Sequence, residues 1–116
     1  MNAARQQRLD ASAEERVCPH FHAAIELIGR RWSGAIIAAL AESPMRFAEL
    51  AQAVPGMSDR LLSQRLKELE SEGLVERSVT AGTPVRVGYS LTAKGEALKP
   101  AISALTSWAR RWHDAA

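Results

Sequence analysis

The stretch that ends near Ser71 carries polar side chains at a spacing that suits hydrogen bonding to the edges of DNA bases. On a helix with about 100° per residue, four of them point roughly 100–200° away from a stripe of leucines. These four are Arg60, Ser63, Gln64 and Lys67. Arginine can bind guanine through two hydrogen bonds, glutamine can do the same to adenine, and serine or lysine can reach bases or phosphates. The pattern therefore predicts a helix face that reads bases in the major groove.

Further residues are candidates for contacts with DNA phosphates. Ser58, with Met57, lies at the start of the same helix, where free backbone N–H groups and the helix dipole attract a phosphate. Basic candidates elsewhere in the chain are Arg30, Arg31, Arg46, Arg77 and Arg86. Phosphate contacts fix the position of a protein on a duplex without reading its sequence.

The polar face also has a simpler interpretation, because polar residues on the outer side of an amphipathic helix are usually only solvated. Glu68, Glu70 and Glu72 follow close behind it. The order of the surrounding elements favours the DNA-binding interpretation.

Two helices are expected before the helix-turn-helix pair that contains the polar segment. The first begins at Pro19, which suits a first helical turn, and ends at Gly29, with apolar residues at helical spacing between them. The second begins at Ser33 as its N-cap, and Ser43-Pro44 ends it.

A compact third helix and the polar fourth helix follow, separated by a tight turn. The third contains Phe47, Leu50, Ala51 and Val54 and is stopped by Pro55-Gly56. Ser58 caps the fourth helix, which buries Leu62, Leu66 and Leu69, runs to about Ser71, and ends in a glycine C-cap at Gly73 followed by Leu74. Helix, short turn and polar-faced helix make a helix-turn-helix.

A two-stranded hairpin and one last helix complete the expected fold. Val75, Arg77 and Val79 alternate with polar neighbours, and after residues 81–84 a second run places Val85, Val87, Tyr89 and Leu91 on one face. Thr92 caps the last helix, whose apolar residues form a narrow seam that suits a partner helix. The seam consists of Leu98, Ile102, Leu105, Trp108 and Trp112. The fold class is mainly α with a small β-hairpin wing, a winged helix-turn-helix that forms a homodimer.

Length and composition fit a single domain. The chain has 116 residues, is 47% hydrophobic and 24% charged, and carries a formal charge of +2. Residues 1–17 show no core pattern and are interpreted as an N-terminal arm, and residues 18–116 as the domain. No apolar run reaches the roughly 18 residues of a membrane span, and the N-terminus does not look like a secretory signal, so we expect a cytoplasmic protein.

Several stretches of the sequence resemble HxlR-type regulators, winged helix-turn-helix transcription factors that are distantly similar to MarR-type repressors. The resemblance covers about residues 18–112. The stretches that carry it are Cys18-Pro19, residues 28–32 (IGRRW), 46–50 (RFAEL), 54–58 (VPGMS), 62–69 (LSQRLKEL), 73–77 (GLVER) and 85–92 (VRVGYSLT). It implies a bacterial regulator, a repressor by analogy, that dimerises through its terminal helices and binds a roughly palindromic operator with the fourth helix in the groove. Gly88 departs from the family, whose members often carry an acidic residue before the tyrosine.

Cys18, the one cysteine of the chain, is a candidate redox sensor. Some proteins of the resembled family sense electrophiles, quinones or oxidants through a cysteine that Cys18 matches by its place before a proline and the first helix. A helix N-terminus stabilises a thiolate, and protonated His20 or His22 would add to this. Oxidation would cross-link two subunits or cap the thiol. The alternative is a small buried core residue.

Other functions remain as alternatives. One alternative is a protein-interaction module, and another is a regulator that responds to a small-molecule ligand at the dimer interface. A thiol enzyme is not expected, because no base and orienting group for Cys18 can be assembled. Neither a metal nor another cofactor is expected, since Cys18, His20 and His22 diverge on a helix and lack a fourth ligand.

Overall fold

A computed structural model of the chain describes residues 18–113, so the arm predicted at residues 1–17 lies outside the described residues. The chain divides after Arg30 into two compact units. The N-terminal unit contains helix α2, Pro19–Gly29, as the sequence predicted. Pro19 occupies the first turn, where its missing N–H is not needed, and Cys18 is the N-cap residue.

The second unit begins with helix α3, Ser33–Glu42, which buries Ile36, Ile37 and Leu40. The prediction that Ser33 is the N-cap is wrong by one position. Trp32 holds the cap position with a left-handed φ of 77°, and its carbonyl accepts the N–H of Ile36 at 3.0 Å. Ser33 is inside the helix and only 2% exposed, because packing against the core draws its small side chain inward.

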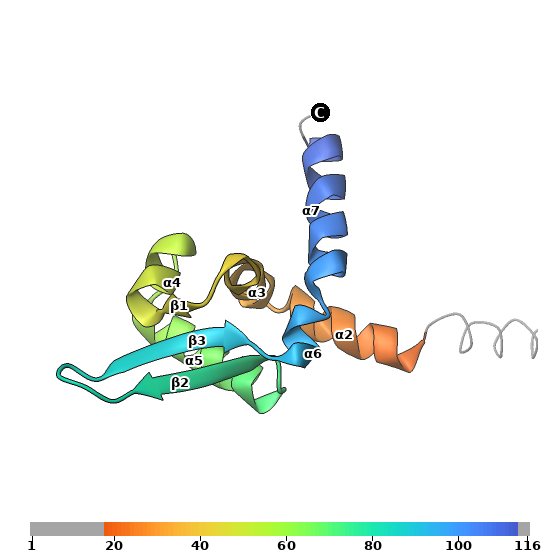
Figure 1. Ribbon diagram of the computed structural model, residues 1–116. Helices are drawn as coiled ribbons and strands as arrows, with labels where there is room; N and C mark the ends of the chain where they lie inside the picture. Colours follow the sequence, from red (N-terminus) through yellow and green to blue (C-terminus); the bar gives the residue numbers. More distant parts are fainter. Residues whose placement is uncertain (1–17, 114–116) are drawn as a thin grey trace, which may run out of the picture. The chain divides into compact units, whose positions relative to one another are not determined.

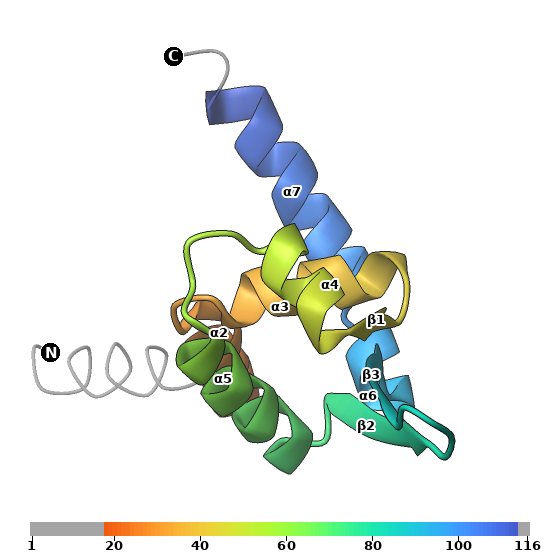
Figure 2. The same cartoon turned by 90° about the vertical axis from the view of Figure 1, so that its left-hand side faces the viewer.

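Helices α4, Phe47–Ala53, and α5, Asp59–Ser71, form the predicted helix-turn-helix pair (Figure 2). Gly56 in the turn between them has a φ of +94°, a conformation that favours glycine. Helix α5 ends at Ser71 as predicted, and the glycine expected to terminate it, Gly73, has a φ of +75°. The N–H of Gly73 donates to the carbonyl of Glu70 and that of Leu74 to Leu69, both at 2.9 Å, the paired bonds of a Schellman motif.

A three-stranded antiparallel sheet replaces the two-stranded hairpin that we expected. Strands β2, Val75–Thr80, and β3, Arg86–Leu91, pair as predicted, and a short strand β1, Met45–Arg46, adds to the other edge of β3. Two residues give too short a pattern to show a strand in the sequence, and β1 exists only because β3 offers it an edge. Beyond the part of the sheet that pairs with β1, strands β2 and β3 continue as a two-stranded wing (Figure 1).

The single last helix of the sequence prediction is two helices, α6, Ala93–Glu96, and α7, Lys99–His113. Thr92 caps α6, because its hydroxyl oxygen accepts the N–H of Gly95 at 3.2 Å. Pro100 explains the break, since proline cannot donate to a carbonyl four residues earlier and its ring clashes there. Leu98 therefore lies in the turn between the two helices rather than on the helix that carries the rest of the seam.

The core of this unit lies between α3, α4, α5 and the base of the sheet. Its fully buried side chains include Ile36, Ile37, Leu50, Leu62, Leu66, Leu69 and Leu74. Helix α7 contributes no buried residue and extends away from this core (Figure 1). The core therefore fixes the helix-turn-helix and the wing, whereas residues 18–113 leave most apolar side chains of α7 exposed.

Candidate nucleic-acid interface

The polar face of α5 lies on its exposed side. Arg60, Gln64 and Lys67 are exposed and Ser63 is half-buried, whereas the leucines at 62, 66 and 69 are each 1% exposed. Among the residues that the structure describes, no hydrogen bond or ion pair involves the side chain of Arg60 or Gln64. Both side chains are therefore available to bases, which the leucines behind them cannot reach.

The start of α5 is ordered by the predicted cap. The hydroxyl oxygen of Ser58 accepts the N–H of Leu61 at 3.1 Å, and the carbonyl of Ser58 accepts the N–H of Leu62 at 2.9 Å. Ser58 is exposed. Its position at the positive end of a 13-residue helix keeps it a candidate for a phosphate contact.

The two wing arginines that we predicted do not share a face. Arg77 pairs with Tyr89, in the row of side chains that continues the core pair Val75 and Leu91. Arg86 pairs with Thr80 on the opposite side of the sheet, because side chains alternate along a strand.

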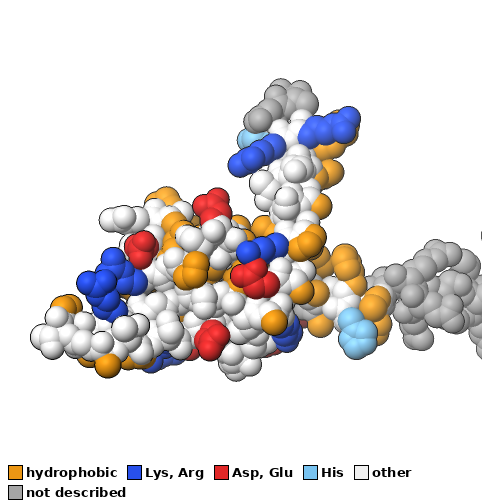
Figure 3. Space-filling model, in the orientation of Figure 1, with side chains coloured by type: hydrophobic (Ala, Val, Ile, Leu, Met, Phe, Trp, Pro, Cys, Tyr) orange, Lys and Arg blue, Asp and Glu red, His pale blue; other side chains and the backbone are white. Residues whose placement is uncertain are grey.

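Arg46 lies on the same face as Arg86. It pairs with Gly88 on β3, and Gly88 pairs with Ser78 on β2. This face, defined by Arg46, Ser78, Gly88 and Arg86, is called the outer wing face below. Gly88 adds no side chain to it, so the two arginines flank an open position. Figure 3 shows a group of Lys and Arg side chains above the hairpin, at the left of the view.

Arg46 also organises the start of α4. Its backbone N–H donates to Glu49 Oε1 at 3.0 Å, and its Nε donates to the same oxygen at 3.3 Å. The backbone hydrogen bond, and after it the side-chain hydrogen bond, hold the pKa of Glu49 below its ordinary value of 4.5. A phosphate that binds Arg46 must therefore compete with Glu49.

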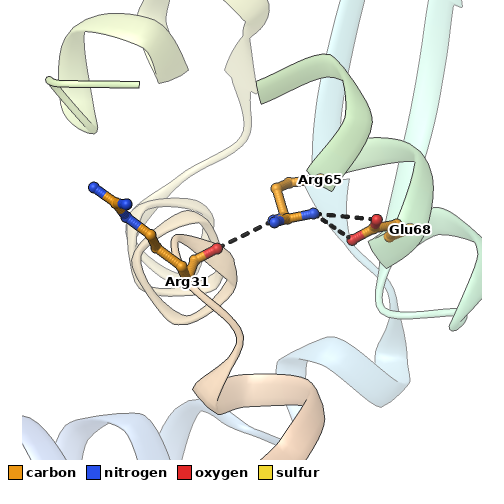
Figure 4. Close-up of polar contacts among 3 residues, drawn as sticks. All are labelled: Arg31, Arg65 and Glu68. Carbon is orange, nitrogen blue, oxygen red and sulfur yellow. Dashed lines mark hydrogen bonds and ion pairs between the residues drawn. The ribbon is translucent and has the colours of Figure 1, made fainter. Parts of the chain in front are cut away.

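Arg31 is exposed, and its guanidinium lies over the ring of Trp32, 5.2 Å from the centroid. Its backbone carbonyl accepts a hydrogen bond from Arg65 of α5 (Figure 4). Sequence reasoning missed Arg65. The spacing of Arg65 and Glu68 could have indicated an ion pair on one side of the helix, but nothing local indicates the partner carbonyl.

The predicted seam is exposed on α7. Leu105, Trp108 and Trp112 are 56%, 61% and 57% exposed, and Ile102 and Leu98 are half-buried. Apolar side chains line one side of α7 in Figure 3. A large apolar patch on one chain marks an interaction surface.

Cys18 is a free, exposed thiol, not a buried core residue. His22, on α2, makes a contact of 2.8 Å with Glu26 through its Nε2. In residues 18–113 no group of three or more Cys, His, Asp and Glu could hold a metal ion.

The helix-turn-helix, the wing and the exposed polar face of α5 define the chain as a winged helix-turn-helix transcription regulator that binds DNA. The sequence model of the HxlR-like helix-turn-helix family matches residues 27–116, and the chain belongs to that family. The family and the winged helix-turn-helix fold inferred from the sequence are thereby confirmed, and the homodimer stays a prediction. No helix in the part of the chain that the structure describes has the length and apolar character needed to cross a bilayer.

Two relatives from Bacillus subtilis strain 168 cover most of the chain. The chain is 45% identical over 101 residues to the HTH-type transcriptional regulator YvaP, and the match covers 87% of this chain and 94% of YvaP. It is 44% identical over 93 residues to the HTH-type transcriptional regulator YodB, and this match covers 80% of this chain and 83% of YodB.

Solved structures agree with this assignment. The reduced form of YodB matches with a TM-score of 0.75 and 43% identity, over 83% of this chain and 94% of that one. The redox regulator HypR in its oxidized form matches with a TM-score of 0.75 and 32% identity, over 81% of this chain and 96% of that one. Structures of YodB treated with diamide and bound to quinone are also similar.

Proposed function

We propose that the protein is a repressor that binds a palindromic operator as a homodimer and releases it when Cys18 is oxidised or modified. The observation that carries the proposal is the exposed side of α5, where Arg60, Gln64 and Lys67 face away from the buried leucine stripe. Arg60 and Gln64 are the base-reading residues, and Ser63 and Lys67 reach bases or phosphates.

The residues around α5 supply the phosphate contacts that set its register. Ser58 lies at the N-terminus of α5, Arg31 precedes α3, and Arg46 and Arg86 extend from the outer wing face. Arg77 is on the other face of the hairpin. It contacts the DNA backbone only if an edge of the wing, rather than its outer face, enters a groove of the duplex. Side chains of this type position a protein on any duplex, whatever its sequence.

Two copies of the chain associate through the apolar seam of α7. Leu105, Trp108 and Trp112 are more than half exposed in one chain, and Leu98 and Ile102 extend the surface. A two-fold dimer presents two α5 helices related by symmetry, so its operator repeats the half-site in inverted orientation. Such a dimer on a promoter represses transcription by occupying it.

Cys18 is the proposed input. Its thiol is exposed, and YodB is known in reduced, diamide-treated and quinone-bound forms. Diamide takes two electrons and two protons from two thiols, and the sulfurs form a disulfide. With one cysteine per chain, such a disulfide joins two subunits. A quinone instead adds to one thiolate through a carbon–sulfur bond, and the proton completes the hydroquinone.

The experiment selects bound duplexes from a random pool with purified, reduced protein and sequences them. We expect an inverted repeat with half-sites about one helical turn apart. Arg60→Ala and Gln64→Ala each weaken operator binding by about 5- to 150-fold, the equivalent of one base contact of ~1–3 kcal/mol. Arg110→Ala on α7 removes a charge outside both proposed surfaces and is the matched control. If no duplex is enriched and binding does not depend on salt, the domain is an interaction module rather than a DNA reader.

The input is tested with the selected operator. Diamide should produce a covalent dimer on non-reducing gels and lower operator affinity in the parent, whereas Cys18→Ser should do neither. In transcription in vitro, reduced protein should lower the yield from a promoter that contains the operator, and an increase would show activation instead. A parental response to diamide that persists in Cys18→Ser would eliminate the sensor.

A further inference from the structure

Arg65 fastens α5 to a segment far away in the sequence. Its Nη1 donates to both carboxylate oxygens of Glu68 at 3.1 Å. Its Nε donates to the backbone carbonyl of Arg31, 34 residues earlier, also at 3.1 Å. The Arg65 side chain is only 16% exposed and that of Glu68 31%. Figure 4 shows the guanidinium between its two partners, whereas the Arg31 side chain points away from it.

The accepting carbonyl belongs to a constrained piece of backbone. It is followed by Trp32, whose φ of 77° is a conformation that bulky residues rarely adopt. The Trp32 ring lies at the turn of the helix-turn-helix, since a Cβ on Gly56 would be 3.4 Å from its Cη2 atom. Arg31 and Trp32 thus contact both the turn, through the ring, and α5, through the carbonyl. A strained residue held by its surroundings in this way often serves function.

The leucine stripe alone does not fix how α5 is rotated. Burial of leucines is non-directional, so Leu62, Leu66 and Leu69 hold the helix against the core while permitting small rotations and tilts. A guanidinium donates in a rigid, planar geometry, and Glu68 holds that plane in place. The direction in which Gln64 and Lys67 project therefore depends on the bond from Arg65 to Arg31.

We infer that Arg65 is a positioning residue for base reading, which sets the orientation of α5 by bonding the Arg31 carbonyl while Glu68 orients its guanidinium. The inference rests on the proposed function, because it concerns the orientation of the proposed reading face. Arg65 itself is not a DNA contact in this inference, since its Nε and Nη1 donate within the protein and its side chain is only 16% exposed. Loss of the Arg65 side chain therefore lowers the preference for the operator over other DNA sequences more than it lowers the affinity for DNA in general.

The test compares two variants with two matched controls. Arg65→Lys keeps the charge but cannot bond the Arg31 carbonyl and both oxygens of Glu68 together, and Arg110→Lys makes the same change on α7. Glu68→Gln removes the charge that orients Arg65, and Glu70→Gln makes the same charge change on the same helix. For each, affinity is measured for the selected operator and for a scrambled duplex over a range of salt concentrations, and thermal unfolding checks that the variant is folded.

We expect Arg65→Lys and Glu68→Gln to lower the ratio of operator to scrambled affinity by about tenfold, the equivalent of one weakened base contact. The salt dependence of scrambled binding stays as in the parent, because no phosphate contact is lost. Both controls keep the parental ratio. A purely stabilising Arg65 lowers the unfolding temperature and leaves the ratio unchanged.

Two results would overturn the inference. One is a parental ratio in both folded variants, and the other is an equal loss for both duplexes with a shallower salt dependence, which indicates a direct phosphate contact. If Arg65→Lys does not fold, Glu68→Gln decides, since it leaves Arg65 in place. If the unmodified protein selects no duplex, the proposed function itself is refuted. If it selects an operator but the variants keep the parental ratio of operator to scrambled affinity, only the inference about Arg65 is refuted.

Discussion

Replacing Gly88 by glutamate tests the outer wing face. Gly88 pairs directly with Arg46 on one neighbouring strand and with Ser78 on the other, and Arg86 lies two residues earlier on the same face. A Cβ at position 88 would lie 3.3 Å from Ser78 Oγ, which can rotate away. A new carboxylate therefore fits between the two arginines. Gly88→Gln has nearly the same shape without the charge and is the control.

The expected effect follows from the number of phosphate contacts withdrawn. Side chains opposite each other on neighbouring strands are about 4.5–5.5 Å apart at Cβ, and an opposite-charge pair there contributes only ~0.2–1 kcal/mol, so stability changes little. Each phosphate contact contributes about 0.9 to the slope of log affinity against log salt, or roughly 3.5-fold between 50 and 200 mM. Withdrawing Arg46, Arg86 or both should reduce the slope by about 0.9–1.8.

The assay is fluorescence anisotropy with a non-specific duplex, titrated at several salt concentrations. Gly88→Glu should bind more weakly at low salt and with a shallower slope than Gly88→Gln. Arg77→Gln should change the slope less than Arg86→Gln, because Arg77 is on the opposite face. Equal slopes for the glutamate and glutamine variants would show that DNA does not meet this face.

Three further predictions concern assembly, packing and pH. Trp108→Ala should raise the dimer dissociation constant about 30-fold or more in sedimentation, the equivalent of a hot spot of ~2 kcal/mol, and an unchanged constant would place the interface elsewhere. Gly95→Ala should destabilise the fold by ~1–3 kcal/mol in urea unfolding, since its Cβ overlaps the Leu74 carbonyl and crowds Leu91, whereas Gly29→Ala, with nothing within 4 Å, should not. Because the pKa of Glu49 lies below its usual value of 4.5, its stabilising effect is complete above that value and is lost as pH falls through the lowered pKa. Glu49→Gln should flatten urea midpoints measured over about pH 3–6, and a parental pH profile in that variant would contradict this assignment.

Local signals in the sequence predicted much of the fold. The Ser58 cap and the Gly73 C-cap bound α5 where expected, because capping is a matter of a few neighbouring residues. The spacing of Leu62, Leu66 and Leu69 predicted which side of α5 is buried and hence which side is polar and exposed. Pro100 is also a local signal, and it accounts for the break between α6 and α7 that the expected single helix lacks.

Other features depend on residues far apart in the chain. Strand β1 forms only on the edge of β3. The pairing register of the strands places Arg77 and Arg86 on opposite faces and brings Arg46 beside Gly88. Alternation along a single strand does not define that register. The bond from Arg65 to the Arg31 carbonyl joins segments 34 residues apart. The amino-acid sequence thus determined the elements and their polar and apolar sides, because these depend on neighbours within a turn or two. Tertiary structure decided which arginines share a face and how α5 is oriented, because both depend on contacts that arise only when distant segments pack.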